Sequence, residues 1–120
     1  MKKLSLLFVI VIGILFSNTT FAQTSKKESI NVWGSCGMCK KKIEKAAKAA
    51  GASAASWDAD KHELEVSYDE SKTSNTKIQE AIVKIGYDTQ DFTATQEAYD
   101  NLPGCCQYDR KPIKKEDSKN

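Results

Sequence analysis

The sequence predicts an α+β domain in which two helices cover one face of a four-stranded antiparallel sheet. Two kinds of hydrophobic periodicity indicate this class. Apolar and polar side chains alternate around residues 30–32 and 64–68, as in half-buried strands, and apolar side chains recur at helical spacing in residues 43–50 and 78–85. A glycine follows each helical stretch, where glycine commonly ends a helix. A chain of 120 residues has room for one small domain of this kind.

The first half of the domain supplies one strand and one helix. Residues 29–33 predict the first strand, because Ile30 and Val32 share a face. From Met38 onward the period becomes helical, with apolar residues at Ile43, Ala46, Ala47 and Ala50. We expect Gly51 to end this helix.

The second half supplies a hairpin, a second helix and a last strand. Residues 52–57 and 63–68 predict strands two and three, joined by a polar turn at 58–61. The second helix has apolar residues at Ile78, Ala81, Ile82 and Ile85, a predicted capping box of Thr76 and Gln79, and Gly86 at its end. Residues 87–92 are short and polar, which predicts a fourth strand at the sheet edge. The order β-α-β-β-α-β is the ferredoxin-like arrangement.

The two ends of the chain differ from this domain in composition. Residues 1–22 combine Lys2 and Lys3 with an apolar run and a small residue at the end, which indicates a secretory signal peptide; an uncleaved anchor is the alternative. We therefore expect a periplasmic or secreted protein with a flexible lead-in at residues 23–28. Residues 94–120 form a C-terminal extension, with weak helical periodicity at 96–102, two adjacent cysteines and a charged tail, predicted to be disordered, from Asp109.

The charge balance argues against nucleic acid as a partner. Removal of residues 1–22 reduces the 18 Lys and Arg residues by two, to 16, which equals the 16 acidic residues. A neutral mature chain lacks the basic excess that phosphate binding requires. Export would also place the cysteines in an oxidising compartment, where a functional thiol pair needs a bound metal or a reducing partner.

Cys36 and Cys39 form a C-x-x-C pair where the first strand gives way to the first helix. Unpaired N–H groups and the helix dipole at this position favour the thiolate. The thiolate is the form that binds a metal or attacks a disulfide. Two soft thiolates suit Cu(I) or Hg(II), and they leave coordination positions open, unlike the four ligands of a structural zinc site.

Residues 29–93 resemble the heavy-metal-associated domain of copper chaperones, periplasmic mercury-binding proteins and metal-transporting ATPases. The resemblance is carried by the C-x-x-C turn, by Val66-x-Tyr68-Asp69 and by Ile82-x-x-Ile85-Gly86-Tyr87-Asp88. It implies that Cys36 and Cys39 bind one soft ion, usually Cu(I), with Hg(II) or Zn(II) as other candidates. It also implies that the ion passes by thiolate exchange to a metal-transporting ATPase or an efflux protein, and only through such a partner do we expect contact with a membrane.

Two further residues are expected beside the site. The resemblance places Tyr87, which follows the second helix, facing the two cysteines. The sequence departs from the family pattern before the first cysteine, where Gly-Met-Thr is usual: the methionine position holds Gly34, preceded by Trp33, and Met38 lies between the cysteines instead.

Other uses of the cysteines stay open at the level of sequence. A thiol–disulfide oxidoreductase shares the C-x-x-C motif, and a structural Cys36–Cys39 disulfide is a third interpretation. Neither proline of the chain is placed as the cis-proline of thioredoxin-like folds, and no Ser/His/Asp set, carboxylate pair or phosphate loop appears, so we expect no enzyme.

The adjacent pair Cys105-Cys106 would form a strained disulfide with itself. A bridge to another cysteine, an auxiliary soft-metal site and idle thiols therefore all remain open for this pair. An auxiliary or regulatory role in metal binding is favoured. The single histidine, His62, is expected to be a surface residue at the start of the third strand.

Overall fold

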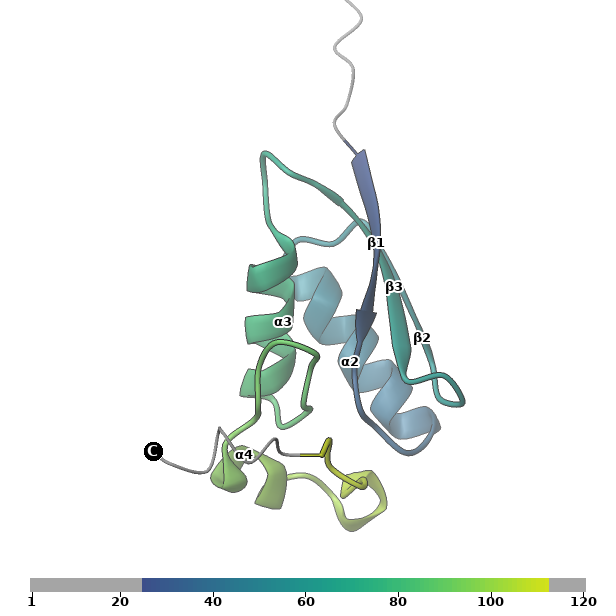
Figure 1. Cartoon of the computed structure of the whole chain (residues 1–120), viewed down its shortest axis with the longest axis vertical. Helices are drawn as coiled ribbons and strands as arrows, with labels where there is room; N and C mark the ends of the chain where they lie inside the picture. The colour runs from purple at the N-terminus through teal and green to yellow at the C-terminus, as the bar shows by residue number, and fades with distance from the viewer. Residues whose placement is uncertain (1–24, 113–120) are drawn as a thin grey trace, which may run out of the picture.

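A computed structural model describes residues 25–112 of the chain (Figure 1). The predicted signal peptide and residues 113–120 of the predicted tail lie outside this range. The elements are β1 (Ser25–Asn31), α2 (Gly37–Ala49), β2 (Ala54–Asp58), β3 (Glu63–Asp69), α3 (Asn75–Lys84), α4 (Gln96–Asp100) and the 3₁₀ turn η1 (Gly104–Cys106). Figure 1 shows α2 and α3 side by side on one face of the sheet, with α4 below them. None of the described helices is long and apolar enough to cross a membrane.

The sheet has three antiparallel strands in the order β1-β3-β2. Ile30 of β1 and Trp57 of β2 both lie opposite Leu64 of β3, and all three side chains are buried against the helices. The alternation in β3 is therefore confirmed. The predicted lead-in is wrong for residues 25–28, because β1 pairs with β3 as far as Ser25 opposite Asp69.

The predicted fourth strand at residues 87–92 does not form. One isolated bridge joins Val32 and Thr89, flanked by a hydrogen bond of 3.0 Å from the Trp33 amide to the Asp88 carbonyl. The Gln90 amide also donates to the Asn31 carbonyl of β1 at 2.9 Å, but the two preceding backbone donors are used elsewhere. The Asp88 amide donates to the Tyr108 hydroxyl, and the Thr89 amide donates to the carbonyl of Phe92. This segment is therefore a loop held by its own turn and by the C-terminal part of the chain.

Both long helices end as predicted, at glycines with positive φ. Gly51 has φ +111° and Gly86 has φ +109°. At each end the glycine amide and the following amide donate back into the last turn, as in a Schellman motif. The predicted capping box is wrong: the residue that caps α3 is Ser74, whose hydroxyl accepts from the Lys77 amide.

Gln79 has a different role from the predicted one. Its side chain is fully buried, so its polar atoms need partners. It accepts from the Thr89 hydroxyl at 2.7 Å and from the Asp91 amide at 3.1 Å, and it donates to the Asp91 carboxylate. Gln79 therefore fixes the loop at residues 87–92, where the fourth strand was expected.

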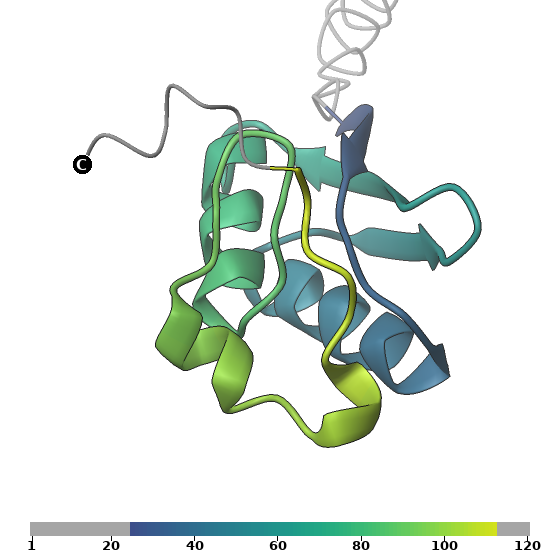
Figure 2. The ribbon, with the colours of Figure 1, turned by 60° about the horizontal axis from the view of Figure 1, so that its bottom comes forward.

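The hydrophobic core continues into the predicted C-terminal extension. Residues 101–112, here called the C-terminal segment, contribute Leu102, Cys106 and Tyr108 to the buried cluster formed by the sheet and helices. Figure 2 shows this segment turning back after η1 and running alongside the loop that follows α3. The predicted helical turns at 96–102 are present as α4. The predicted disorder is wrong for residues 109–112, because Arg110 and Lys111 bind the loop at 88–92.

Candidate metal centre

Three cysteine sulfurs converge at the start of α2. The Sγ atoms of Cys36, Cys39 and Cys106 all lie within 4.8 Å of one another, and the Cys36 and Cys39 sulfurs are 3.8 Å apart. Cys39 and Cys106 are fully buried, whereas Cys36 is partly exposed. The four cysteines of the chain are all free thiols in this structure. Of the predicted auxiliary pair, Cys106 thus joins the predicted ligands and Cys105 does not.

Local structure explains the position of the first two cysteines. Cys36 is the extended residue immediately before α2, with φ −143°, so its side chain lies at the helix N-terminus. Cys39 is in the first turn, four residues before Ile43 and eight before Ala47, and all three are buried. It therefore faces the core on the apolar side of the helix.

The loop before Cys36 depends on a close approach between Gly34 and Trp57. A Cβ atom on Gly34 would stand 2.9 Å from two ring carbons of Trp57, and the Trp57 indole donates a hydrogen bond of 2.9 Å to the Val32 carbonyl. The indole ring thus fills the space under this loop. The ring of Trp57 leaves no room for a side chain at position 34, which explains the glycine there.

Ser35 is a site residue that the sequence analysis did not single out. Its single hydroxyl proton has two acceptors within reach, the Cys39 sulfur at 3.5 Å and the Cys105 carbonyl oxygen at 3.1 Å. The Cys36 thiol reaches the same Cys105 carbonyl at 3.4 Å. Ser35 stands at the threonine position of the Gly-Met-Thr pattern described above. Its hydroxyl, directly before Cys36, could have identified it as a site residue from the sequence.

The two buried thiols differ in protonation. Burial raises the pKa of Cys39, but hydrogen bonds from the Ser35 side chain and backbone, from Tyr87 and from the Cys36 backbone outweigh it and bring the pKa to about 6. Burial, and then the adjacent Cys39, raise the pKa of Cys106 to about 12. Of these two adjacent thiols, Cys39 is therefore the one that gives up its proton more readily.

The structure places Tyr87 against these two sulfurs. Its side chain is fully buried, and its hydroxyl lacks a hydrogen-bond partner of good geometry within the described part of the chain. Burial, followed by the Cys39 and Cys106 sulfurs, raises the pKa of Tyr87, so the phenol keeps its proton. The ring stacks on Tyr108 with centroids 5.5 Å apart. Tyr87 thus presents a protonated hydroxyl to the cysteine cluster.

Met38 and Cys105 lie outside the cluster of three sulfurs. Met38 is 48% exposed, and its thioether accepts from the exposed Cys105 thiol at 3.6 Å. His62 is likewise absent from the cluster. It occupies the turn before β3, with φ +52°, and stacks on the Trp57 ring.

The C-terminal segment holds Cys106 in place from both sides. Before it, the Cys106 amide donates to the Pro103 carbonyl at 2.8 Å. After it, the Tyr108 hydroxyl donates to the Gly86 carbonyl and accepts from the Asp88 amide. Cys106 is therefore attached to the loop that follows α3, next to Tyr87.

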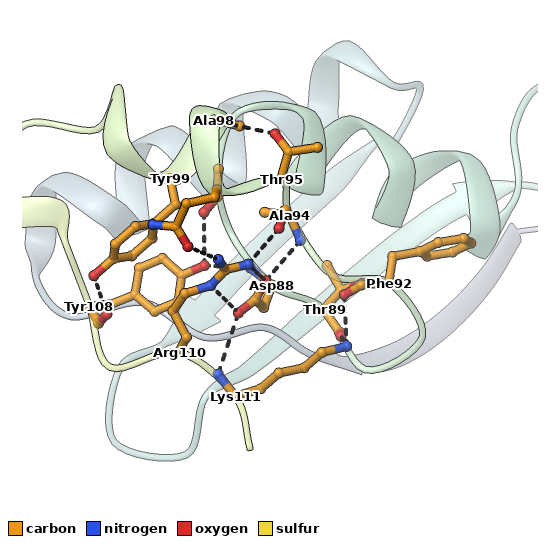
Figure 3. A network of polar contacts seen from close by, with 12 residues as sticks. Asp88, Thr89, Phe92, Ala94, Thr95, Ala98, Tyr99, Tyr108, Arg110 and Lys111 are labelled. Atoms are coloured by element: carbon orange, nitrogen blue, oxygen red, sulfur yellow. Dashed lines mark hydrogen bonds and ion pairs between the residues drawn. The ribbon is translucent and has the colours of Figure 1, made fainter. Parts of the chain in front are cut away.

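Figure 3 shows the network that fixes the end of this segment. The Arg110 guanidinium binds both carboxylate oxygens of the buried Asp88, at 3.0 and 2.8 Å, and the Ala94 amide donates to the same carboxylate. Lys111 donates to the carbonyls of Thr89 and Phe92. Burial raises the pKa of Asp88, but Arg110 and the Ala94 amide outweigh it and hold the pKa below its usual range.

Comparison with known proteins shows which family the region containing Cys36 and Cys39 resembles. The family model of the heavy-metal-associated domain matches residues 35–88. The copper chaperone CopZ of Staphylococcus haemolyticus (strain JCSC1435) is 43% identical over 63 residues, which are 51% of this chain and 93% of that protein. Residues beyond 88, including Cys106, lie outside the family match.

Solved structures agree with this comparison. A CopZ metallochaperone superposes with a TM-score of 0.51 at 35% identity, covering 53% of this chain and 98% of that chain. The crystal structure of oxidised MerP from Ralstonia metallidurans CH34 superposes with a TM-score of 0.52 at 25% identity, covering 55% and 94%. The likeness thus spans nearly the whole of these small proteins and about half of the present chain.

Proposed function

Because this chain belongs to the heavy-metal-associated domain family, we propose that it is an exported carrier that binds Cu(I) or a similar soft ion and passes it to a transport protein. The curated relative that this chain covers to 93% of its length is a copper chaperone and not an enzyme, which agrees with the expectation that this chain is not an enzyme. The observation that carries the proposal is the pair of Cys36 and Cys39 sulfurs, 3.8 Å apart at a helix N-terminus.

The two cysteines suit uptake and release of an ion because they differ in exposure. Cys39 is buried and has the lowered pKa, so it provides a thiolate ready to bind. Cys36 is partly exposed and follows the loop that contains Gly34 and Ser35. A partner's thiolate therefore reaches the ion from the side of Cys36. Exchange then replaces one sulfur at a time, and the ion is never released as a free aqueous species. Soft thiolates favour Cu(I), with Hg(II) and Zn(II) as the alternatives.

Anaerobic titration of the reduced protein tests the binding step. Cu(I), Hg(II) and Zn(II) are added separately to residues 23–120, and bound ions are counted by native mass spectrometry. We expect one tightly bound Cu(I) per chain and its loss in the double variant Cys36→Ser/Cys39→Ser. Stoichiometric Cu(I) binding by that double variant would show that the ion is held elsewhere.

Export and the transport partner are supported by sequence alone. Residues 1–22 have the pattern of a signal peptide, so we expect a mature protein that begins at Gln23 in the periplasmic or secreted fraction. Intact mass and N-terminal sequencing of the natively expressed protein check this. A membrane-bound protein that retains residues 1–22 would instead identify the segment as an anchor. The proposed recipient is a metal-transporting ATPase or efflux protein that offers its own thiolates.

A further inference from the structure

We propose that Cys106 is a third ligand, so that the C-terminal segment completes a three-thiolate site for a soft ion. This inference rests on the proposed function of Cys36 and Cys39 and extends it beyond the region that matches the family. In this site the ion binds the three sulfurs as thiolates, and any thiol protons pass to solvent.

The spacing of the sulfurs fits three-coordinate binding. Three sulfurs about 2.3 Å from a central ion in a trigonal plane are about 4.0 Å apart, whereas two sulfurs on opposite sides of an ion are about 4.6 Å apart. The Cys36 and Cys39 sulfurs are 3.8 Å apart, and all three sulfurs lie within 4.8 Å of one another. The Cys36–Cys39 distance is thus close to that of a trigonal site, and the Cys106 sulfur lies near enough to both to be its third ligand.

The surroundings of Cys106 favour a ligand over a packing residue. Its thiol is fully buried in the core, yet the groups around it include the Cys39 thiol and the Tyr87 hydroxyl. A side chain that serves only packing would face apolar groups alone. The unpaired Tyr87 hydroxyl beside both sulfurs is a donor suited to a thiolate, and it has no other partner there.

Contacts of the C-terminal segment hold Cys106 in position without a bound ion. Tyr108 anchors the segment two residues later, and the Asp88–Arg110 pair fixes it four residues later. A ligand on a fixed segment loses little conformational freedom when it binds. The third thiolate therefore slows loss of the ion without preventing exchange, because Cys36 remains partly exposed.

Sulfur coordination in the Cu(I)-loaded full-length mature protein tests the proposal directly. X-ray absorption at the copper edge counts the sulfur ligands and gives the mean copper–sulfur distance. We expect three sulfurs in the wild-type protein. Two sulfurs at the shorter distance of linear coordination would overturn the proposal, and this measurement needs no variant that has to fold.

Variants then assign the third sulfur. Cys106→Ser and Cys106→Ala should reduce the sulfur count to two and weaken retention of Cu(I) against a competing chelator by at least about tenfold. Cys105→Ser is the matched control, because Cys105 is adjacent, exposed and outside the cluster, and it should behave as wild type. Circular dichroism confirms that each variant is folded before it is compared.

The outcomes separate this inference from the proposed function. Wild-type retention and sulfur count in a folded Cys106 variant would remove Cys106 from the site while leaving the Cys36–Cys39 carrier intact. Unchanged Cu(I) binding in Cys36→Ser/Cys39→Ser would overturn the carrier and the three-thiolate site together. If Cys105→Ser reduced the sulfur count and Cys106→Ser did not, the third ligand would be Cys105. This result would also overturn the proposal.

Discussion

At the scale of single residues, the reactivity of Cys39 depends on hydroxyl groups as much as on the helix. α2 has no acidic residue in its first turn, and the Cys36 side chain makes no capping hydrogen bond. The Ser35 hydroxyl lies 3.5 Å from the Cys39 sulfur, and the Tyr87 hydroxyl also lowers the pKa of Cys39. Burial works in the opposite direction, since it favours the neutral thiol.

Removal of the Ser35 hydroxyl should therefore raise the pKa of Cys39 above its present value of about 6. Loss of one hydrogen bond to a charged group corresponds to roughly one pKa unit in Ser35→Ala, since the backbone donor is kept. The thiolate is followed by ultraviolet absorbance during a pH titration of the metal-free protein. A Cys105→Ser background removes the exposed thiol from the signal, and an unchanged titration would mean that Ser35 does not stabilise the thiolate.

The sequence could reveal the site residues that lie close together along the chain, but not those that lie far apart along it. Cys36 and Cys39 share a turn at the start of one helix, so their spacing alone brings their sulfurs together. Cys106 reaches the same place only because the chain reverses at η1, and that reversal depends on contacts made by Tyr108 and Arg110 with residues about twenty positions earlier. Residues 105–112 have no hydrophobic period that would predict such contacts.

At the scale of elements, local patterns worked where one face of an element is buried. The period-two alternation of β3 was predictable for this reason, and the ends of α2 and α3 were predictable because glycine readily adopts positive φ. The edge strand was not, because the Asp88 and Thr89 amides bind Tyr108 and Phe92, and only the Gln90 amide binds β1. A competition of this kind depends on tertiary contacts that a short polar stretch does not display.

The junction between β1 and α2 supplies a prediction at this scale. Gly34→Ala should destabilise the domain by about 1–3 kcal/mol, because the new methyl group would stand 2.9 Å from the Trp57 ring and 3.2 Å from the Ile43 side chain. Gly37→Ala, at the first residue of α2, is the matched control. Its Cβ would meet no atom within 4 Å, and alanine favours the helix, so we expect a neutral or slightly stabilising effect.

Chemical denaturation of the metal-free variants measures both changes. A midpoint for Gly34→Ala equal to that of Gly37→Ala would show that the indole ring moves aside freely, and the account of the loop would then be wrong. Cu(I) retention in folded Gly34→Ala should also fall, because the loop carries Ser35 and Cys36 next to the clash.

At the scale of the whole molecule, the C-terminal segment joins the core to the metal centre. Leu102, Cys106 and Tyr108 are buried with residues of the sheet and helices, so the folding unit extends past the region that matches the family. Under the three-thiolate proposal, stability and ion retention are coupled, because the same segment contributes to both.

The Asp88–Arg110 pair makes this coupling dependent on pH. The pKa of the buried Asp88 carboxyl is lowered in the folded state, so the pair contributes its full stability above the unfolded pKa, about 3.9, and loses it as the pH falls through the lower folded value. Asp88→Asn should therefore cost about 3 kcal/mol at neutral pH, because it leaves the Arg110 guanidinium without its carboxylate. The difference from wild type should shrink only in acid, below the usual range of an aspartate. Thermal unfolding of both metal-free proteins at several pH values measures it, and a difference that is constant down to the most acidic condition would show that the ionised carboxylate does not hold the segment.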